Sequence, residues 1–310
     1  SPISVFPVES VSSTVGRLRD LGIRHYKLIF NGDFRENQED QRDLVQALVS
    51  ADIQPIVRLY QPRQSPHRNH LLTHRLDSVR QLIEAYGDKA ALFEVVNEPN
   101  LLVEWAEGYN PTWQDNDLVT ALVTSWYEDA MTLLNLGTRP AIPAFAPTDR
   151  GGTHDRYSGV MWLRRFMECL AHQHPDLQGE IREGRIWAAS HSAAFARPFD
   201  FDPVRPGGRI DDMCLRSYEI VKQTVHDTFD VYPSVISTED GVYSPFHMHQ
   251  LGWSASPEVV MLEGSDQVYY DIHSWGQRVV EAFTFLSSRA RPLKLDGMCM
   301  WHFSDEGSAA

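Results

Sequence analysis

Short apolar runs alternate with helical patterns along almost the whole chain, and this alternation restricts the fold more than any other feature. The runs are rich in Val, Ile, Ala or aromatic residues and have no long polar face, as expected for strands buried on both sides. The eight predicted strands are 3–6, 25–30, 55–60, 91–96, 140–146, 185–190, 233–238 and 297–303.

Most of the segments between these runs carry apolar residues at spacings of three and four, which predicts helices over 38–49, 76–83, 117–133, 157–172 and 269–288. Repeated strand–helix alternation predicts a parallel sheet, and eight units predict a (β/α)8 TIM barrel. The alternative is an open doubly wound sheet, but no G-x-G-x-x-G turn follows the early strands. The last predicted strand ends near Phe303 and the sequence ends at Ala310, so the final helix is missing or replaced by a shorter closure.

Composition favours one globular domain over residues 1–310, because no Gly/Ser tract, charge block or low-complexity stretch marks a linker. The formal net charge is −14, which repels phosphate backbones and argues against a nucleic-acid partner. The sequence contains no run of about 18 apolar residues, so we predict no membrane-spanning helix. The composition leaves the cellular location and the oligomeric state open.

Two distant peptides each deliver a glutamate to the end of a predicted strand. Val95-Val96-Asn97-Glu98 is interrupted by Pro99, and Val235-Ile236-Ser237-Thr238-Glu239 is interrupted at Gly241. Parallel strands of a barrel end at one rim, so residues 239 − 98 = 141 positions apart are predicted to meet there. Two carboxylates at one site are the pair that hydrolysis of a glycosidic bond requires.

The two glutamates are predicted to have different tasks. A general acid must hold its proton near neutral pH, which burial or a neighbouring carboxylate promotes. Glu98 is the candidate acid, and Asn97 beside it is placed to bind a substrate hydroxyl. Glu239 is the candidate nucleophile that attacks the anomeric carbon. For either glutamate alone, an exposed loop residue is the simpler interpretation.

Asn97-Glu98-Pro99 after the fourth predicted strand and Thr238-Glu239-x-Gly241 after the seventh resemble the retaining glycoside hydrolases of clan A, the 4/7 superfamily. The resemblance implies that Glu98 is the acid/base and Glu239 the nucleophile. It also implies that Trp301, on the eighth predicted strand, is the floor of the −1 sugar subsite. His191, after the sixth, resembles a substrate-binding histidine of some cellulase-like members.

The sequence departs from the clan pattern at two places. Clan members usually carry an arginine on strand two that supports the nucleophile, whereas this chain has Lys27 and Asn31 there. The nearest arginine is Arg58 on the third predicted strand, which we assign to substrate binding. Many members also have a tyrosine near strand six, and the nearest candidate here is Tyr218.

Glu94 lies four positions before Glu98, so both side chains point to the same side of a regular strand. A carboxylate inside the barrel requires a partner. Lys27 and Arg58 lie on the two preceding predicted strands, which predicts an interior network of Lys27, Arg58 and Glu94.

Aromatic residues in the loops after the fourth and seventh predicted strands are candidates for stacking on sugar rings. The loop 101–115 contains Trp105 and Trp113, and the loop 243–264 contains Trp253. Each of them is equally well explained as packing its loop against the barrel.

The sequence predicts neither a metal nor a cofactor. Its histidine groups, His67 to His74 and His247 with His249, lack the His-Glu-x-x-His spacing, and three scattered cysteines form no ligand cluster. The predicted function is a retaining glycosidase acting on an oligo- or polysaccharide. The alternatives are a transglycosidase with the same site, a non-catalytic carbohydrate-binding barrel and a metal-dependent hydrolase. The sugar, the linkage and endo or exo action stay open.

Overall fold

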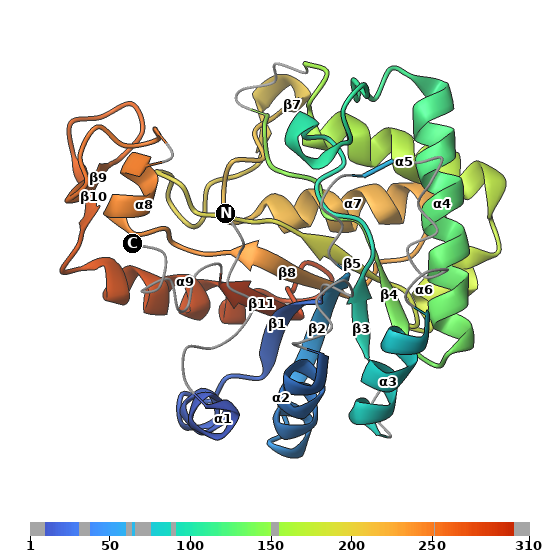
Figure 1. The fold of residues 1–310 in the computed structure, drawn as a ribbon. Coiled ribbons are helices and arrows are strands. Elements are labelled where there is room, and N and C mark those ends of the chain that lie inside the picture. The colour runs from blue at the N-terminus through green and yellow to red at the C-terminus, as the bar shows by residue number, and fades with distance from the viewer. Residues whose placement is uncertain are drawn as a thin grey trace.

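The computed structural model describes residues 10–30, 38–59, 64–65, 76–87, 91–149, 155–250 and 252–300. A parallel sheet of seven strands curves into a nearly closed barrel, with helices on its outer face (Figure 1). In sheet order the strands are β1 (His25–Phe30), β2 (Gln54–Leu59), β3 (Leu92–Glu94), β4 (Arg139–Ile142), β5 (Trp187–Ser190), β8 (Val235–Asp240) and β11 (Gly297–Met300).

The seven strands match the second to eighth predicted strands, and the predicted (β/α) barrel is confirmed. The first predicted strand, 3–6, and the end of the eighth lie outside the described residues. The edge strands β1 and β11 approach each other, since a Cβ on Gly297 of β11 would lie 2.9 Å from the ring of His25 on β1.

The main helices are α1 (Val11–Asp20), α2 (Gln38–Ser50), α3 (Leu76–Tyr86), α4 (Asn116–Asn135), α5 (Gly159–Gln173), α7 (Ser217–Phe229) and α9 (Trp275–Ser288). The short helices are α6 (Leu177–Arg182) and α8 (Pro245–Gln250). The helix predicted from residue 269 is wrong at its start, because Val268–Asp271 forms strand β10, paired with β9 (Val259–Met261). Among the described residues no helix is both long and apolar enough to cross a membrane.

The barrel wall has a different packing on each side. Its outer side packs against the helices through large buried side chains such as Phe93, Trp126 and Phe166. The inner side carries an apolar cluster, which we call the inner cluster: Ile56, Leu92, Ala141, Ala144, Trp187, Ala189, Ile236 and Cys299. Strand alternation then sends the next inward side chains, Arg58 and Glu94, toward the carboxyl ends of the strands.

Two isolated parallel bridges continue the strand pairing past the ends of the strands. Asn97 pairs with Ala144, and Ala193 pairs with Gly241. The segments that follow β3, β4, β5 and β8 therefore remain paired with their neighbours at the same rim, which is where parallel α/β barrels place their sites.

Candidate active site

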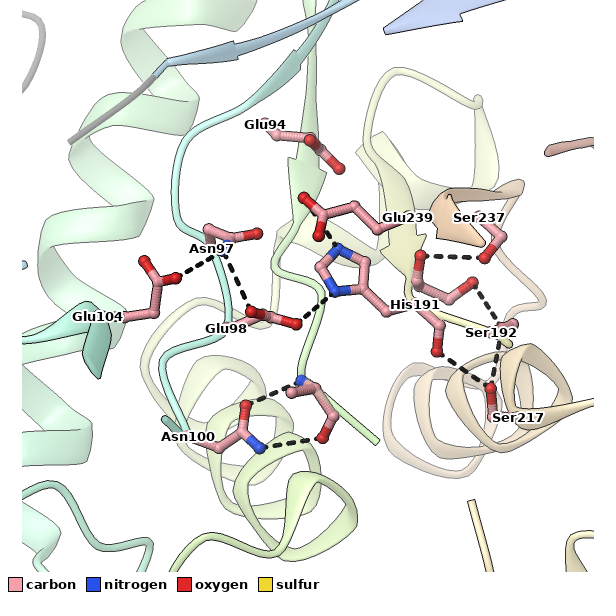
Figure 2. Close-up of polar contacts among 12 residues, drawn as sticks. Glu94, Asn97, Glu98, Asn100, Glu104, His191, Ser192, Ser217, Ser237 and Glu239 are labelled. Carbon is pink, nitrogen blue, oxygen red and sulfur yellow. Dashed lines mark hydrogen bonds and ion pairs between the residues drawn. The ribbon is translucent and has the colours of Figure 1, made fainter. Parts of the chain in front are cut away.

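Glu98 lies at the rim on a strained turn after β3. Its φ is +39°, in the left-handed region that residues other than glycine seldom adopt. The turn is held because the Glu98 N–H donates to the Ala144 carbonyl at 3.0 Å and the Gln64 amide donates to the Asn97 carbonyl at 2.6 Å. Asn100 binds the next loop on both its amide atoms, donating to the Ala146 carbonyl and accepting from the Ala146 N–H (Figure 2).

Glu239 points into the barrel because of an irregularity in β8. Ser237 pairs with Met298 of β11 and Asp240 pairs with Met300, so β8 contains one residue more than its partner between these pairs. Ile236 belongs to the inner cluster, and strict alternation would therefore send Glu239 to the outer face. The extra residue is a β-bulge that reverses the alternation, as bulges next to functional sites often do.

Two cations contact the same oxygen of Glu239. The Lys27 ammonium lies 2.9 Å from Glu239 Oε1, and Arg58 Nη1 lies 2.5 Å from it. Both side chains are less than a tenth exposed. Lys27 on β1 and Arg58 on β2 thus both contact the Glu239 carboxylate. Arg58, which was predicted to bind substrate, has its guanidinium buried against Glu239, and its contact with substrate stays a prediction.

His191, in the segment after β5, lies between the two glutamates (Figure 2). Its Nδ1 is 2.8 Å from Glu98 Oε1, and its Nε2 is 3.9 Å from Glu239 Oε1. Serine hydroxyls fix this segment: Ser217 donates to the His191 carbonyl at 3.2 Å, and Ser237 donates to the Ser190 carbonyl at 3.1 Å. The ring is therefore held by its backbone as well as by Glu98.

The two carboxylates are close together. One ligating atom each of Glu98, His191 and Glu239 lies within 4.8 Å of the other two. Such a group is within reach of one metal ion, but Glu239 Oε1 already faces Lys27 and Arg58, whose positive charges oppose a bound cation. The group therefore fits proton transfer and nucleophilic attack better than metal binding.

The surroundings lower the pKa of the Glu239 carboxyl group and raise the pKa of the His191 imidazole. Burial raises the pKa of Glu239, but Lys27, His191 and Arg58 outweigh it and hold that pKa at about 2. Burial lowers the pKa of His191, but the charges of Glu239 and Glu98 outweigh it and raise that pKa above its usual value. Glu239 is thus an anion near neutral pH. His191, which lies beside Glu98, binds a proton more readily than a free histidine does.

The predicted interior network is present and includes Glu239. Lys27 Nζ lies 2.9 Å from Glu94 Oε2 as well as 2.9 Å from Glu239 Oε1. Arg58 is the register partner of Glu94 on the neighbouring strand. Glu94 is 4% exposed, so the carboxylate lies inside the barrel as predicted.

The other predicted site residues lie in different environments. Asn97 contacts both Glu98 Oε2, at 3.5 Å, and Glu104 Oε1, at 3.3 Å, so its amide faces the site. Trp105 is 3% exposed, and its indole donates to the Pro99 carbonyl, so its ring supports the Glu98 turn and offers no open face to a sugar. Trp301 lies outside the described residues.

Among the tryptophans that the structure describes, Trp253 and Trp113 stay candidates for sugar contact. Trp253 is 38% exposed and packs against Phe195, with ring centroids 4.8 Å apart, and against Tyr243. Trp113 is half-buried and donates to the Asp155 carbonyl.

Tyr218 does not approach Glu239. It is fully buried on α7, and its hydroxyl faces Glu219 at 3.4 Å. Sequence reasoning also missed Glu104, whose carboxylate lies 4.0 Å from Arg58 and binds Asn97. Its position in the loop after β3 gave no distinguishing signal.

The sequence matches no protein-family model and no curated protein. Its structure is similar to a GH5 cellulase from an Icelandic hot spring isolate, with a TM-score of 0.51, 13% identity, and coverage of 96% of this chain and 70% of the cellulase. It is also similar to a β-glucosidase from Thermotoga maritima in complex with deoxynojirimycin, with a TM-score of 0.53, 15% identity, and coverage of 94% and 76%. At these identities the similarity establishes the fold, and the resemblance that the motifs implied is confirmed at that level.

Proposed function

We propose that the chain is a retaining glycosidase that cleaves O-glycosidic bonds of an oligo- or polysaccharide. The observation that carries the proposal is the pair of Glu98 and Glu239, with carboxylate oxygens within 4.8 Å and unlike electrostatic surroundings. Retaining enzymes hold their carboxyl groups about 5–5.5 Å apart, whereas inverting enzymes need roughly 6.5–9.5 Å to admit a water. The 4.8 Å limit joins single oxygens of the two carboxylates and is shorter than the inverting range, which supports retention.

In the first step, a Glu239 oxygen attacks the anomeric carbon. Lys27, Arg58 and His191 all lie on the side of Oε1, so Oε2 is the attacking atom. The bond to the glycosidic oxygen breaks, its electron pair stays on that oxygen, and the proton of Glu98 is transferred to it. The products are a free alcohol and a glycosyl ester on Glu239.

In the second step, the Glu98 carboxylate takes a proton from a water molecule whose oxygen attacks the anomeric carbon. The ester bond breaks, and its electron pair returns to Glu239 beside Lys27 and Arg58. His191 Nδ1 lies 2.8 Å from Glu98 Oε1, where it donates to the carboxylate when protonated and accepts from the carboxyl group when neutral, so it stabilises each of the two charge states that Glu98 passes through.

Trp253 is proposed as a platform for a further sugar of the substrate. Phe195 lies four positions after His191, and Tyr243 lies four positions after Glu239. Four residues span at most about 14 Å, so the rings that hold Trp253 lie within a few sugar lengths of the reacting carbon. A rigid, exposed indole is well suited to stack on a sugar face. The platform predicts a preference for oligosaccharides over simple aryl glycosides.

A 2-fluoro glycoside with an activated leaving group tests the proposal, because it traps the ester of a retaining enzyme. A panel of aryl β-glycosides and β-glucans provides the starting sugars, since the structural neighbours are a cellulase and a β-glucosidase. We expect one covalent sugar on the Glu239 peptide by mass spectrometry. Sugar binding without labelling or turnover contradicts the proposal and supports a carbohydrate-binding barrel. Loss of turnover on chelation supports a metal-dependent hydrolase.

A further inference from the structure

Lys27 lies between two buried carboxylates, only one of which has a part in the proposed reaction. Its ammonium is 2.9 Å from Glu239 Oε1 and 2.9 Å from Glu94 Oε2. Lys27 is on the same face of the sheet as its register partner Ile56, so its methylene stem runs past the inner cluster to reach both carboxylates. The single ammonium of Lys27 therefore forms ion pairs with both Glu239 and Glu94.

The position of Glu94 is costly for the fold. The side chain is 4% exposed, and its Oε1 accepts no hydrogen bond from the residues that the structure describes. Leu92, two positions earlier on the same face, belongs to the inner cluster. Replacing buried ion pairs with apolar residues is often neutral or stabilising, so packing alone gives no reason for a carboxylate here. Costly buried charges of this kind concentrate at functional sites.

We propose that Glu94 is a positioning residue that acts through Lys27 to keep the reactivity of Glu239 balanced between the two steps. This inference rests on the proposed function. In the free enzyme, Glu94 and Glu239 together face Lys27 and Arg58. In the glycosyl enzyme, Glu239 is a neutral ester, and Glu94 is then the carboxylate that contacts Lys27.

The same contact weakens the hold of Lys27 on Glu239. Without the charge of Glu94, the ammonium interacts more strongly with the Glu239 carboxylate, because the competing anion is gone. A more stabilised carboxylate is a poorer nucleophile and a better leaving group. Removing the charge of Glu94 therefore slows formation of the ester and leaves its hydrolysis unchanged or faster.

The variant Glu94→Gln tests this, because it removes the charge and keeps the shape. The probe is an aryl glycoside with a good leaving group, for which kcat reports ester hydrolysis and kcat/KM reports ester formation. We expect kcat/KM to fall about tenfold, a change of about 1.4 kcal/mol in the barrier, and kcat to change less than twofold. Equal losses in both parameters, or no loss in either, overturn the inference.

Glu219→Gln is the matched control for the removal of a buried carboxylate. Glu219 is 7% exposed and pairs with Arg216 and Arg289, each at 2.7 Å, away from the site. We expect this variant to lose thermal stability while both kinetic parameters stay within twofold of the wild type. A kcat/KM loss in it like that of Glu94→Gln shows a general effect of destabilisation and overturns the inference.

A double-mutant cycle tests whether Glu94 acts through Lys27. In a Lys27→Met background, Glu94→Gln is expected to change kcat/KM by less than twofold, because the mediator is gone. A full tenfold effect in that background overturns the inference. If Glu94→Gln does not fold, Glu94→Asp replaces it, and the retained but withdrawn charge is expected to give a smaller effect of the same kind.

The labelling experiment separates failure of the inference from failure of the proposed function. If the wild type is labelled on Glu239 and Glu94→Gln has unchanged kinetics, the inference is wrong and the proposed function stands. If the wild type is neither labelled nor active on any glycoside, both are wrong.

Discussion

The ends of β3 and β8 present the same side chain at the same rim in opposite surroundings. Glu98, past the end of β3, is placed by a strained turn, and its nearest partners are His191 and the neutral amide of Asn97. Glu239, on β8, is placed by a bulge, and two permanent cations face one of its oxygens.

Under the proposed function, this difference in surroundings gives two identical residues different tasks. A partner that exchanges a proton suits an acid/base, because it supports both charge states of the glutamate. Partners that never lose their charge suit a nucleophile, which must be an anion before attack and again after the second step. The proposed roles thus follow from the neighbouring side chains more than from the glutamates themselves.

The largest expected effect comes from removing each carboxylate and supplying azide as a substitute. Glu98→Ala should slow turnover on the order of 10²–10⁴-fold for substrates with poor leaving groups. Azide should restore turnover and give a glycosyl azide with the anomeric configuration of the substrate, because azide attacks the ester. Glu239→Ala should be slower still, and azide should give the inverted product, because it replaces the nucleophile. Nuclear magnetic resonance of the products distinguishes the two, and exchanged stereochemistry shows that the roles are reversed.

Much of the barrel was predictable from the sequence because its strands are buried on both sides and its helices repeat at three and four positions. Seven predicted strands are present, and strand order placed Glu98 and Glu239 at one rim. The start of the last helix was wrong, because Val268–Asp271 pairs as a strand with a segment that its local pattern does not reveal.

The immediate surroundings of the glutamates were less predictable. The interior network of Lys27, Arg58 and Glu94 was anticipated from alternation along the strands, but its contact with Glu239 was not. Alternation from Ile236 directs Glu239 outward, and only the bulge against β11 reverses it. A bulge depends on pairing between strands distant in the sequence, so no local signal predicts it. Trp105 was predicted to contact substrate because of its residue type, but its ring is buried and has no open face for a sugar.

A smaller effect is expected from replacing Lys27. The loss of this cation makes the surroundings of Glu239 on β8 more like those of Glu98 after β3. Lys27→Met removes one of the two cations that keep Glu239 ionised, and it should lower kcat/KM on the acid side of the pH profile by about tenfold for each unit by which the pKa of Glu239 rises. The pKa of Glu239 should rise, so the acid limb of the pH profile should move to higher pH. Activity needs ionised Glu239 and disappears as pH falls through that pKa.

Lys27→Arg is the control for this variant, since it keeps the positive charge at the same position. It should retain most of the activity and the wild-type acid limb. An acid limb that stays in place in Lys27→Met shows that Lys27 does not set the ionisation of Glu239.

The smallest expected effect is on how the free energy of unfolding changes with pH. Its direction follows from the lowered pKa of Glu239. Its pKa is about 2 in the folded chain and 4.5 as its usual value. A lowered pKa stabilises the fold above 4.5, and this stabilisation is lost as pH falls toward 2. Between pH 4.5 and about pH 3, the loss amounts to roughly 1.5 kcal/mol of the free energy of unfolding. Urea unfolding at a series of pH values should show this slope in the wild type and in Lys27→Arg. Glu239→Gln should lack it, since it has no carboxyl group to protonate, and the same slope in that variant would assign the acid sensitivity to other groups.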